Sequence, residues 1–475
     1  MKNKLITIIL TLVVILSSIA VLPQNEIMTS AMLKNIIILF CSLLLIILIL
    51  TNYQKLKFDN KDLLLLTFLL LVITSTFMST DIHKSIYGEG SRYEGLLMFI
   101  SYACIYLASK KFFEYKKISI FFNVMFYTSL FIGIIGFFQN YLNIPNTIFT
   151  LVPKATFGNQ NFFGSYISIV LPISMSIYIL YNSNKALVLS NIMFFNMLSC
   201  GTRSAWIAFT VVSFLGIIYL VKIKNKVFLK RCILLIICFI LIFLFIYNGI
   251  GNYIFSHTLF SGTSSYNLKE RFKVIGNDLD LISKNGLSNK LGSSRIEIWK
   301  MTLKVVEKYP LLGYGTDNLQ LGLIFSCPDD VINYINAHHG IPDKAHNEYL
   351  HIAATLGIPA LLVYLIFLAL IVLPKLKNMD KDKKSLIFSL AILSYLAQAF
   401  FNISTIGVSP LFWMLLGLSD NENIERSIIK YEQDQEKNIW NFYETFCRKR
   451  IWRYKHRRNY SYCWSCKRNI ILSFF

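Results

Sequence analysis

Charge, and above all negative charge, is scarce in this chain. Only 15% of its 475 residues are charged, and 26 Asp and Glu residues stand against 47 Lys and Arg residues, which gives a formal net charge of +21. Hydrophobic residues make up 55% of the chain. Many windows contain the roughly 20 apolar residues that a helix needs to cross a hydrocarbon core about 30 Å thick, and a soluble protein does not need runs this apolar. The composition therefore excludes an ordinary soluble protein and predicts an all-α, polytopic membrane protein.

The sequence also disfavours a disulfide-stabilised protein and a nucleic-acid-binding protein. The nine cysteines lie mostly inside apolar runs, where a thiol behaves as a small hydrophobe, and Cys327 is alone in the long polar segment, so no disulfide framework is encoded there. The excess of basic residues would suggest nucleic-acid binding in a soluble chain. Here most of them lie in short loops between apolar runs, so the positive-inside rule explains them better and no nucleic-acid partner is expected.

About twelve transmembrane helices are predicted. Their expected ranges are Leu5–Leu22, Leu33–Leu50, Leu63–Met78, Gly95–Ala108, Ile118–Phe138, Phe163–Tyr181, Leu187–Cys200, Ala205–Val221, Cys232–Tyr247, Tyr349–Leu373, Leu386–Phe401 and Ile406–Leu418. The seventh and the twelfth are short for a full crossing. The first resembles a signal peptide, but its apolar core is long for a cleaved signal, so a retained helix is expected.

The placement of lysine and arginine predicts the orientation. With the N-terminus inside, the cytoplasmic loops hold eighteen Lys and Arg residues and the short outer loops hold five. Both termini are therefore expected in the cytoplasm of a multi-pass plasma-membrane protein. The expected division is transmembrane helices 1–9 over residues 1–248, an extracytoplasmic loop over 249–345, transmembrane helices 10–12 over 346–418, and a cytoplasmic tail over 419–475.

The large loop and the tail differ in pattern. Apolar residues recur with a helical period from Arg295 to Tyr309, whereas the polar stretch from Ser261 to Ser294 shows little periodicity and is expected to be flexible. The tail has a basic, aromatic stretch from Arg448 to Arg468 that could lie on the anionic inner leaflet, although disorder or a sequence out of its original frame is the more ordinary interpretation. Its lone Cys463–Cys466 pair is too weak to predict a zinc site.

His346 is the leading candidate for chemistry. Asp343 is a plausible N-cap for the helix that follows, which would place His346 in the first helical turn, beside unpaired amides that favour anions and a neutral imidazole. The apolar run after it leads the chain into the bilayer. A neutral histidine at a membrane surface can accept a proton next to a phosphorylated lipid.

Arg203 is the most informative arginine, because it lies in a tight turn between two apolar runs with no acidic residue nearby in sequence. Charge at that depth is costly and usually functional, and a planar guanidinium can bind a diphosphate with two hydrogen bonds. Alternatively, Arg203 has no functional role and its side chain only extends to the membrane–water interface. Arg203 by itself does not distinguish this interpretation from diphosphate binding.

A metal site is the competing hypothesis for the histidines. His338, His339, His346 and His351 fall within fourteen positions. However, His346 and His351 are five residues apart on a presumed helix and point to different faces, and two adjacent histidines also chelate poorly. No metal or other cofactor is therefore expected.

Several motifs together resemble the O-antigen ligase and polymerase superfamily. They are Gly-Thr-Arg-Ser-Ala-Trp at 201–206, Ser-Arg-Ile-Glu-Ile-Trp at 294–299, Pro-Leu-Leu-Gly-Tyr-Gly at 310–315, His-Asn-Glu-Tyr-Leu at 346–350, and two outer-loop sequences at 92–95 and 157–161. The resemblance covers residues from about Gly90 to Leu418. In the ligases a Gly follows the His-Asn pair after nine residues, with a small residue three further on. Gly357 and Ala360 take these places here, but Pro359 is expected to kink the tenth span.

The resemblance implies a glycosyltransferase of the extracytoplasmic face that uses an undecaprenyl-diphosphate-linked glycan as donor and the hydroxyl of a sugar or other molecule as acceptor. By that analogy, Arg203 and Arg295 hold the donor diphosphate, and His346 accepts the acceptor's proton, so that attack inverts the sugar centre without a metal. Four further residues are possible supporting groups: Arg92, Asn161, Asn347 and Glu348.

Two other functions compete with this one. A transporter or flippase for the lipid-linked glycan predicts ionisable groups inside the spans and two related halves, but these spans are nearly free of charge and the sequence shows no repeat. A sensor or structural membrane protein would leave the histidine-bearing loop idle. Within the superfamily, ligase and polymerase share their donor chemistry, so both remain open.

Overall fold

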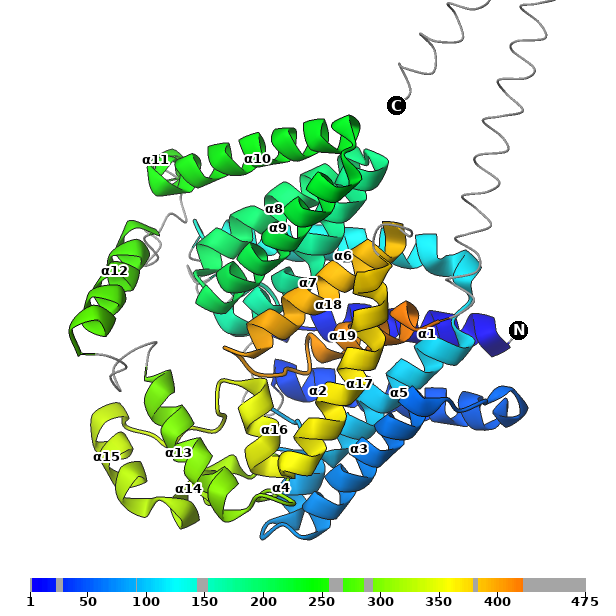
Figure 1. Cartoon of the computed structure of the whole chain (residues 1–475), viewed down its shortest axis with the longest axis vertical. Helices are drawn as coiled ribbons and strands as arrows, with labels where there is room; N and C mark the ends of the chain where they lie inside the picture. The colour runs from blue at the N-terminus through cyan, green and yellow to red at the C-terminus, as the bar shows by residue number, and fades with distance from the viewer. Residues whose placement is uncertain are drawn as a thin grey trace, which may run out of the picture.

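The computed structural model describes residues 2–22, 29–90, 92–142, 153–255, 268–285, 294–378 and 383–421. Within these ranges the regular structure is helical throughout, with no β-strand (Figure 1). Figure 1 shows the long helices gathered into a bundle, while α12 to α15 lie along one side of it. The prediction of an all-α, polytopic membrane protein is confirmed.

Twenty-one helical segments make up the described chain. The first half contains α1 (Lys2–Ile19), α2 (Ser30–Leu50), η1 (Tyr53–Lys55), α3 (Asn60–Phe77), α4 (Ile82–Tyr87), α5 (Leu96–Phe112), η2 (Tyr115–Lys117), α6 (Ile118–Gln139), α7 (Gln160–Tyr181), α8 (Asn184–Cys200), α9 (Arg203–Ile223) and α10 (Lys226–Tyr247). The second half contains α11 (Ile250–Phe255), α12 (Leu268–Asn285), α13 (Arg295–Lys308), α14 (Leu319–Ser326), α15 (Pro328–His338), α16 (Glu348–Leu356), α17 (Ile358–Lys377), α18 (Lys383–Ala399) and α19 (Ser409–Ser419).

Eight of the described helices are long and apolar enough to cross a membrane. They are α1, α2, α3, α6 with the η2 turn before it, α7, α9, α10 and α17. Helices α5, α8 and α18 have 17 residues each and α19 has 11, so they fall short of the usual length. The count of twelve spans therefore remains a prediction.

Helix α7 is the centre of the bundle. In its most apolar window, 83% of the residues are buried, against 11% for α10, which lies at the periphery (Figure 1). It packs against α8, α9 and α18. Asn159 begins α7 because its side chain accepts the amide of Asn161, and Pro172 is accommodated deep inside the helix, where neighbouring helices surround it.

The tenth predicted span, Tyr349–Leu373, is two helices rather than one. Helix α16 ends at Leu356 and α17 begins at Ile358, with Gly357 between them at φ +91°. The break therefore falls two residues before Pro359, whose place in the first turn of α17 suits its missing amide. With nine residues, α16 is too short to cross a bilayer, and it packs against α13 and α14.

The large loop is more regular than its sequence indicated. The helix predicted at Arg295–Tyr309 is confirmed as α13, whereas the expectation of an irregular segment over Ser261–Ser294 is wrong for α12. Phe272 of α12 stacks on Trp206 at 5.7 Å between ring centroids, and Leu268 is buried. The predictions for the tail beyond residue 421 lie outside the described residues.

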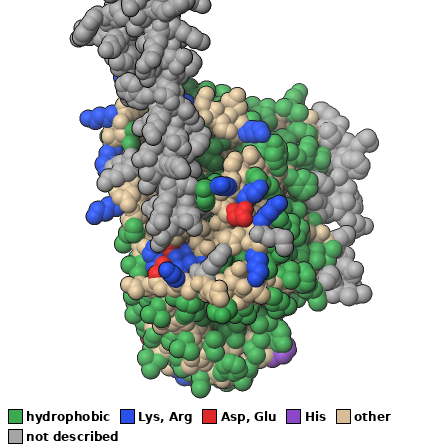
Figure 2. All heavy atoms as spheres, turned by 90° about the vertical axis from the view of Figure 1, so that its right-hand side faces the viewer, with side chains coloured by type: hydrophobic (Ala, Val, Ile, Leu, Met, Phe, Trp, Pro, Cys, Tyr) green, Lys and Arg blue, Asp and Glu red, His purple; other side chains and the backbone are tan. Residues whose placement is uncertain are grey.

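A cluster of buried charges joins three helix ends on one side of the bundle. The ammonium group of Lys110, in the last turn of α5, lies 2.7 Å from Asp62 of α3 and 2.7 Å from Asp420, which follows α19. Figure 2 shows the side of the molecule that carries the N-terminus, where Lys and Arg side chains gather around a few acidic ones. These charges lie at helix ends, where a membrane interface would meet them.

Candidate functional site

The backbone around His346 differs from the sequence-based expectation. Helix α16 begins at Glu348, and its N-cap is Asn347, whose side chain accepts the amide of Leu350 at 3.0 Å. The prediction that Asp343 caps this helix is therefore wrong, and His346 lies outside the first turn. Its φ is +50°, a left-handed conformation that non-glycine residues seldom adopt. A histidine held in that conformation needs firm support from both sides.

The residues on either side of His346 are anchored to distant parts of the chain. Arg92 donates from Nε to a carboxylate oxygen of Asp343 at 2.7 Å. Trp299, one turn into α13, donates its indole N–H to the carbonyl of Ala345 at 3.0 Å. Asn347 is buried and occupied as the cap of α16. The imidazole is thus carried by a segment fixed before and after it.

Arg203 and Arg295 are brought close to one another by the fold. Arg203 opens α9 after a tight turn in which Gly201 has φ +63°, as its sequence predicted. Arg295 opens α13. Burial, and then the positive charge of Arg203, lower the pKa of Arg295 below its ordinary value. Two guanidinium groups that repel one another in a partly dry site are a suitable environment for an anion.

His346 shares this positive environment. Burial, together with the positive charges of Arg295 and Arg92 and against the opposing charge of Asp343, lowers the pKa of His346 from 6.5 to about 4. The imidazole is therefore neutral at physiological pH and able to accept a proton. Among the residues that the structure describes, its buried Nδ1 has no hydrogen-bond partner.

The two outer-loop sequences also reach this region. The guanidinium of Arg92 lies over the ring of Phe162 at 5.2 Å, next to Asn161 in the first turn of α7. Asn402 donates to the backbone carbonyl of Asn161 at 3.0 Å. The turn before Arg203 contacts the same place, because the Thr202 hydroxyl donates to the carbonyl of Gln160 at 3.0 Å. The structure therefore groups Arg92, Asn161 and Arg203 around the N-terminus of α7.

Glu348 is placed differently from the other predicted residues. Its buried carboxylate accepts hydrogen bonds from the hydroxyls of Tyr364 at 3.2 Å and Tyr395 at 3.1 Å, both inside the bundle. Burial raises its pKa to about 7. It joins α16 to α17 and α18, so a packing role fits it better than contact with a ligand.

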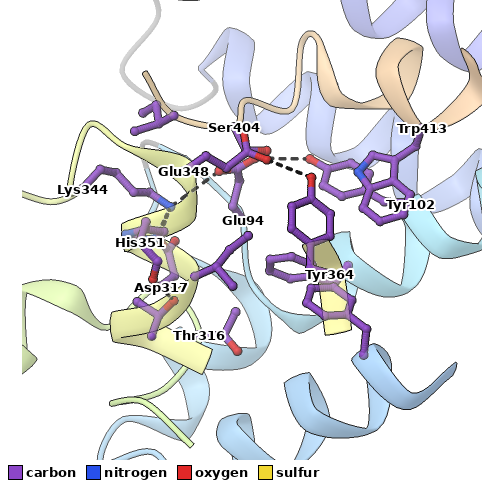
Figure 3. A pocket seen from close by; sticks show the side chains of 15 residues that line it. Glu94, Tyr102, Thr316, Asp317, Lys344, Glu348, His351, Tyr364, Ser404 and Trp413 are labelled. Atoms are coloured by element: carbon purple, nitrogen blue, oxygen red, sulfur yellow. Dashed lines mark hydrogen bonds and ion pairs between the residues drawn. The ribbon is translucent and has the colours of Figure 1, made fainter. Parts of the chain in front are cut away.

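Three buried groups close to His346 were missed by sequence reasoning: Glu94, Asp317 and Lys344. Glu94 lies within the motif at 92–95, and Lys344 is two residues before His346, but neither position stands out in a single sequence. Their proximity in space is a product of the fold (Figure 3).

The histidines do not converge. His338 ends α15 with Nε2 at 3.6 Å from Glu297, and His351 lies beside Lys344. Over the described parts of the chain, no three His, Cys, Asp or Glu side chains are arranged to hold a metal ion.

Comparison with known families gives one match. Residues 188–365 match the model of a family described as O-antigen ligase. This range includes Arg203, Arg295 and His346 and excludes Arg92 and Asn161. The resemblance found in the sequence motifs is thereby confirmed. The comparison with curated proteins found no match.

Proposed function

Because residues 188–365 match a family described as O-antigen ligase, we propose that the chain belongs to the O-antigen ligase and polymerase superfamily and transfers glycan from an undecaprenyl-diphosphate-linked donor to an acceptor hydroxyl. The reaction takes place at the outer face of the cytoplasmic membrane, in the synthesis of a surface polysaccharide. The observation that carries the proposal is the neutral imidazole of His346 in the field of Arg295, which itself lies within the field of Arg203.

Each group has a defined task in this reaction. Arg203 and Arg295 hold the donor diphosphate and stabilise the negative charge that grows as the bond between the sugar C1 and the diphosphate oxygen breaks. His346 takes the proton of the acceptor hydroxyl while its oxygen forms the new bond to C1 from the opposite side, so the configuration inverts. A positioned base of this kind typically contributes about 10²–10⁴-fold. The arginines supply the positive charge, and no metal is required.

The orientation that this requires has independent support. The predicted cytoplasmic loops hold eighteen Lys and Arg residues against five in the short outer loops. The segment that bears His346 and α13 then lies outside, the basic side in Figure 2 faces the cytoplasm, and both termini are cytoplasmic. The domain division at residues 248, 345 and 418 follows the same scheme.

Substitution of two of the three central residues, His346 and Arg203, tests the proposal. We expect His346→Ala and Arg203→Ala proteins to insert and fold but to lose glycan transfer by about 10²-fold or more in membranes supplied with lipid-linked donor. His339→Asn is the matched control, because His339 is exposed at the end of α15 and Asn tolerates its φ of +59°. Full activity of either alanine variant would reject the assignment.

The acceptor is addressed by a different experiment. A strain that lacks the protein should accumulate single repeat units if the protein is a polymerase, and long unattached chains if it is a ligase. Unchanged glycans would argue against both.

Retention of transfer in the presence of chelators is expected, and a loss restored by zinc would favour a metal enzyme.

A further inference from the structure

A buried polar cluster lies directly behind the segment that carries His346. It consists of Lys344, Asp317, Glu94 and His351 (Figure 3). Asp317 lies 2.5 Å from the Lys344 ammonium, Glu94 lies 3.5 Å from it, and Nε2 of His351 lies 3.4 Å from it. The side chain of Lys344 is only 2% exposed. A lysine buried this deeply keeps its charge where carboxylates compensate it.

Each carboxylate is itself tied to a separate element. Asp317 accepts the backbone amide of Glu89 at 2.6 Å, and Glu94 accepts the hydroxyl of Ser404 at 2.6 Å. Lys344 thereby joins the His346 segment to the loop before α5, the loop before α14 and the loop before α19. Although burial alone would lower it, the charges of Asp317 and Glu94 raise the pKa of Lys344 above its ordinary value, so the ammonium stays charged.

The cavity beside this cluster is too small to be the glycan site. Its volume is about 40 Å³, enough for about two or three waters and not for a sugar ring. Its aromatic lining, which includes Tyr102, Tyr364 and Trp413, encloses the cluster on the bundle side (Figure 3). The cluster therefore acts on the chemistry only through the segment that it holds.

We propose that Lys344 is a positioning residue for His346. This inference rests on the proposed function, since it assigns Lys344 a part in the same reaction. Four of the five residues from Asp343 to Asn347 have an anchor: Asp343 pairs with Arg92, Lys344 with the buried carboxylates, the Ala345 carbonyl with Trp299, and Asn347 with the helix it caps. The fifth, His346, is held in its left-handed conformation by these neighbours. Two of the four anchors are ion pairs, and the pair of Lys344 with Asp317 is more deeply buried than the pair of Arg92 with Asp343.

The kinetic test separates positioning from stability. We expect Lys344→Gln to lower kcat about 10–100-fold, because a small displacement of a catalytic group has this effect. The KM for the donor should stay unchanged, because Arg203 and Arg295 are not disturbed. Lys344→Arg should recover most of kcat, since a guanidinium can still pair with both carboxylates. Lys304→Gln is the matched control, because Lys304 forms an exposed ion pair with Asp330 on the same side of the molecule. A Lys344→Gln protein with less folded material but normal kcat would overturn the proposal.

A double variant sharpens the test. In a His346→Ala background, Lys344→Gln should cause no further loss of transfer, because the group that it positions is already absent. An additional loss of the same size as in the native background would show that Lys344 acts independently of His346 and would overturn the proposal. If Lys344→Gln does not fold, Asp317→Asn replaces it, because this change weakens the same ion pair and leaves Glu94 beside Lys344.

A measurement that needs no enzymatic activity keeps this inference distinct from the proposed function. Carbethoxylation of His346 by diethyl pyrocarbonate, followed by peptide mass spectrometry, reports how the half-buried imidazole is held. We expect faster modification of His346 in Lys344→Gln or Asp317→Asn than in the native protein, with His339 unchanged. If His346→Ala retains full transfer while this rate still rises, the proposed function fails and the positioning stands. An unchanged rate at His346 would overturn the positioning itself.

Discussion

At the scale of single residues, the unusual feature is the conformation of His346. A φ of +50° costs a histidine about 1–3 kcal/mol and persists only because the surrounding structure over-determines it. The charge of Arg295 acts on the imidazole that this segment carries.

The lowered pKa of His346 leads to a prediction for pH dependence. The neutral ring is the active base, so kcat/KM should stay level from about pH 8 down to about pH 5 and fall as the pH drops through about 4, the pKa of His346. Arg295→Met removes a positive neighbour, which should raise the pKa of His346 and move this acid limb to higher pH. Lys300→Met, on the same helix and exposed, should leave it in place. A limb near pH 6.5 in the native enzyme would contradict the burial of His346.

At the scale of elements, the break between α16 and α17 explains the Pro-Leu-Leu-Gly-Tyr-Gly motif. Ile358 donates to the carbonyl of Pro310 at 2.8 Å, and Tyr314 donates to that of Ala354 at 2.9 Å. A Cβ on Gly357 would lie 2.2 Å from the carbonyl oxygen of Leu311. Glycine is needed because the two backbones touch. The motif after α13 thus holds the end of α16, and with it the His346 segment.

Gly357→Ala should destabilise the protein. The substitution places a Cβ in a left-handed conformation, which costs about 1–3 kcal/mol, and drives it into the backbone of Leu311. We expect a lower temperature of thermal aggregation in detergent and reduced transfer. Gly216→Ala in α9 is the control, since a Cβ there meets no atom within 4 Å. Equal melting of the two variants would mean that α16 and the 310–315 segment are not in contact.

At the scale of the whole molecule, charge is segregated. The buried cluster of Lys110, Asp62 and Asp420 closes one side of the bundle, while the arginines and His346 are grouped elsewhere. A transporter would need ionisable groups along its path through the membrane. The Lys110 cluster instead lies at the ends of α3, α5 and α19, as expected of an interfacial anchor.

Sidedness can be measured directly. An impermeant maleimide should label His339→Cys in intact cells, because this position is exposed and the proposed orientation puts it outside the cytoplasmic membrane. Lys57→Cys, exposed in the loop between α2 and α3, should be labelled only after the membrane is opened. The native chain, treated in the same way, corrects for its own cysteines. Labelling of position 339 only in opened cells would put His346 in the cytosol and remove the proposed enzyme.

Much of the helical framework follows from the sequence. Apolar runs and the 3.6-residue period act over one or two turns, so α6, α7 and α13 were predictable within a few residues. The helix α12 was missed although Leu268, Phe272, Ile275, Leu279 and Ile282 recur with a helical period, because the polar residues between them dominate the composition of the segment. The motifs predicted Arg203, Arg295 and His346 as site residues, and this remains a prediction, whereas no motif pointed to Lys344.

What the sequence by itself determined was the class of protein and the residues able to perform the chemistry, because hydropathy and residue type are local properties. What only the tertiary structure decided was their arrangement. Arg92 and Asp343 are 251 residues apart in the chain and 2.7 Å apart in space, and Lys344 finds its carboxylates in two other loops. Such pairings depend on how helices pack around α7, and no local pattern encodes that packing.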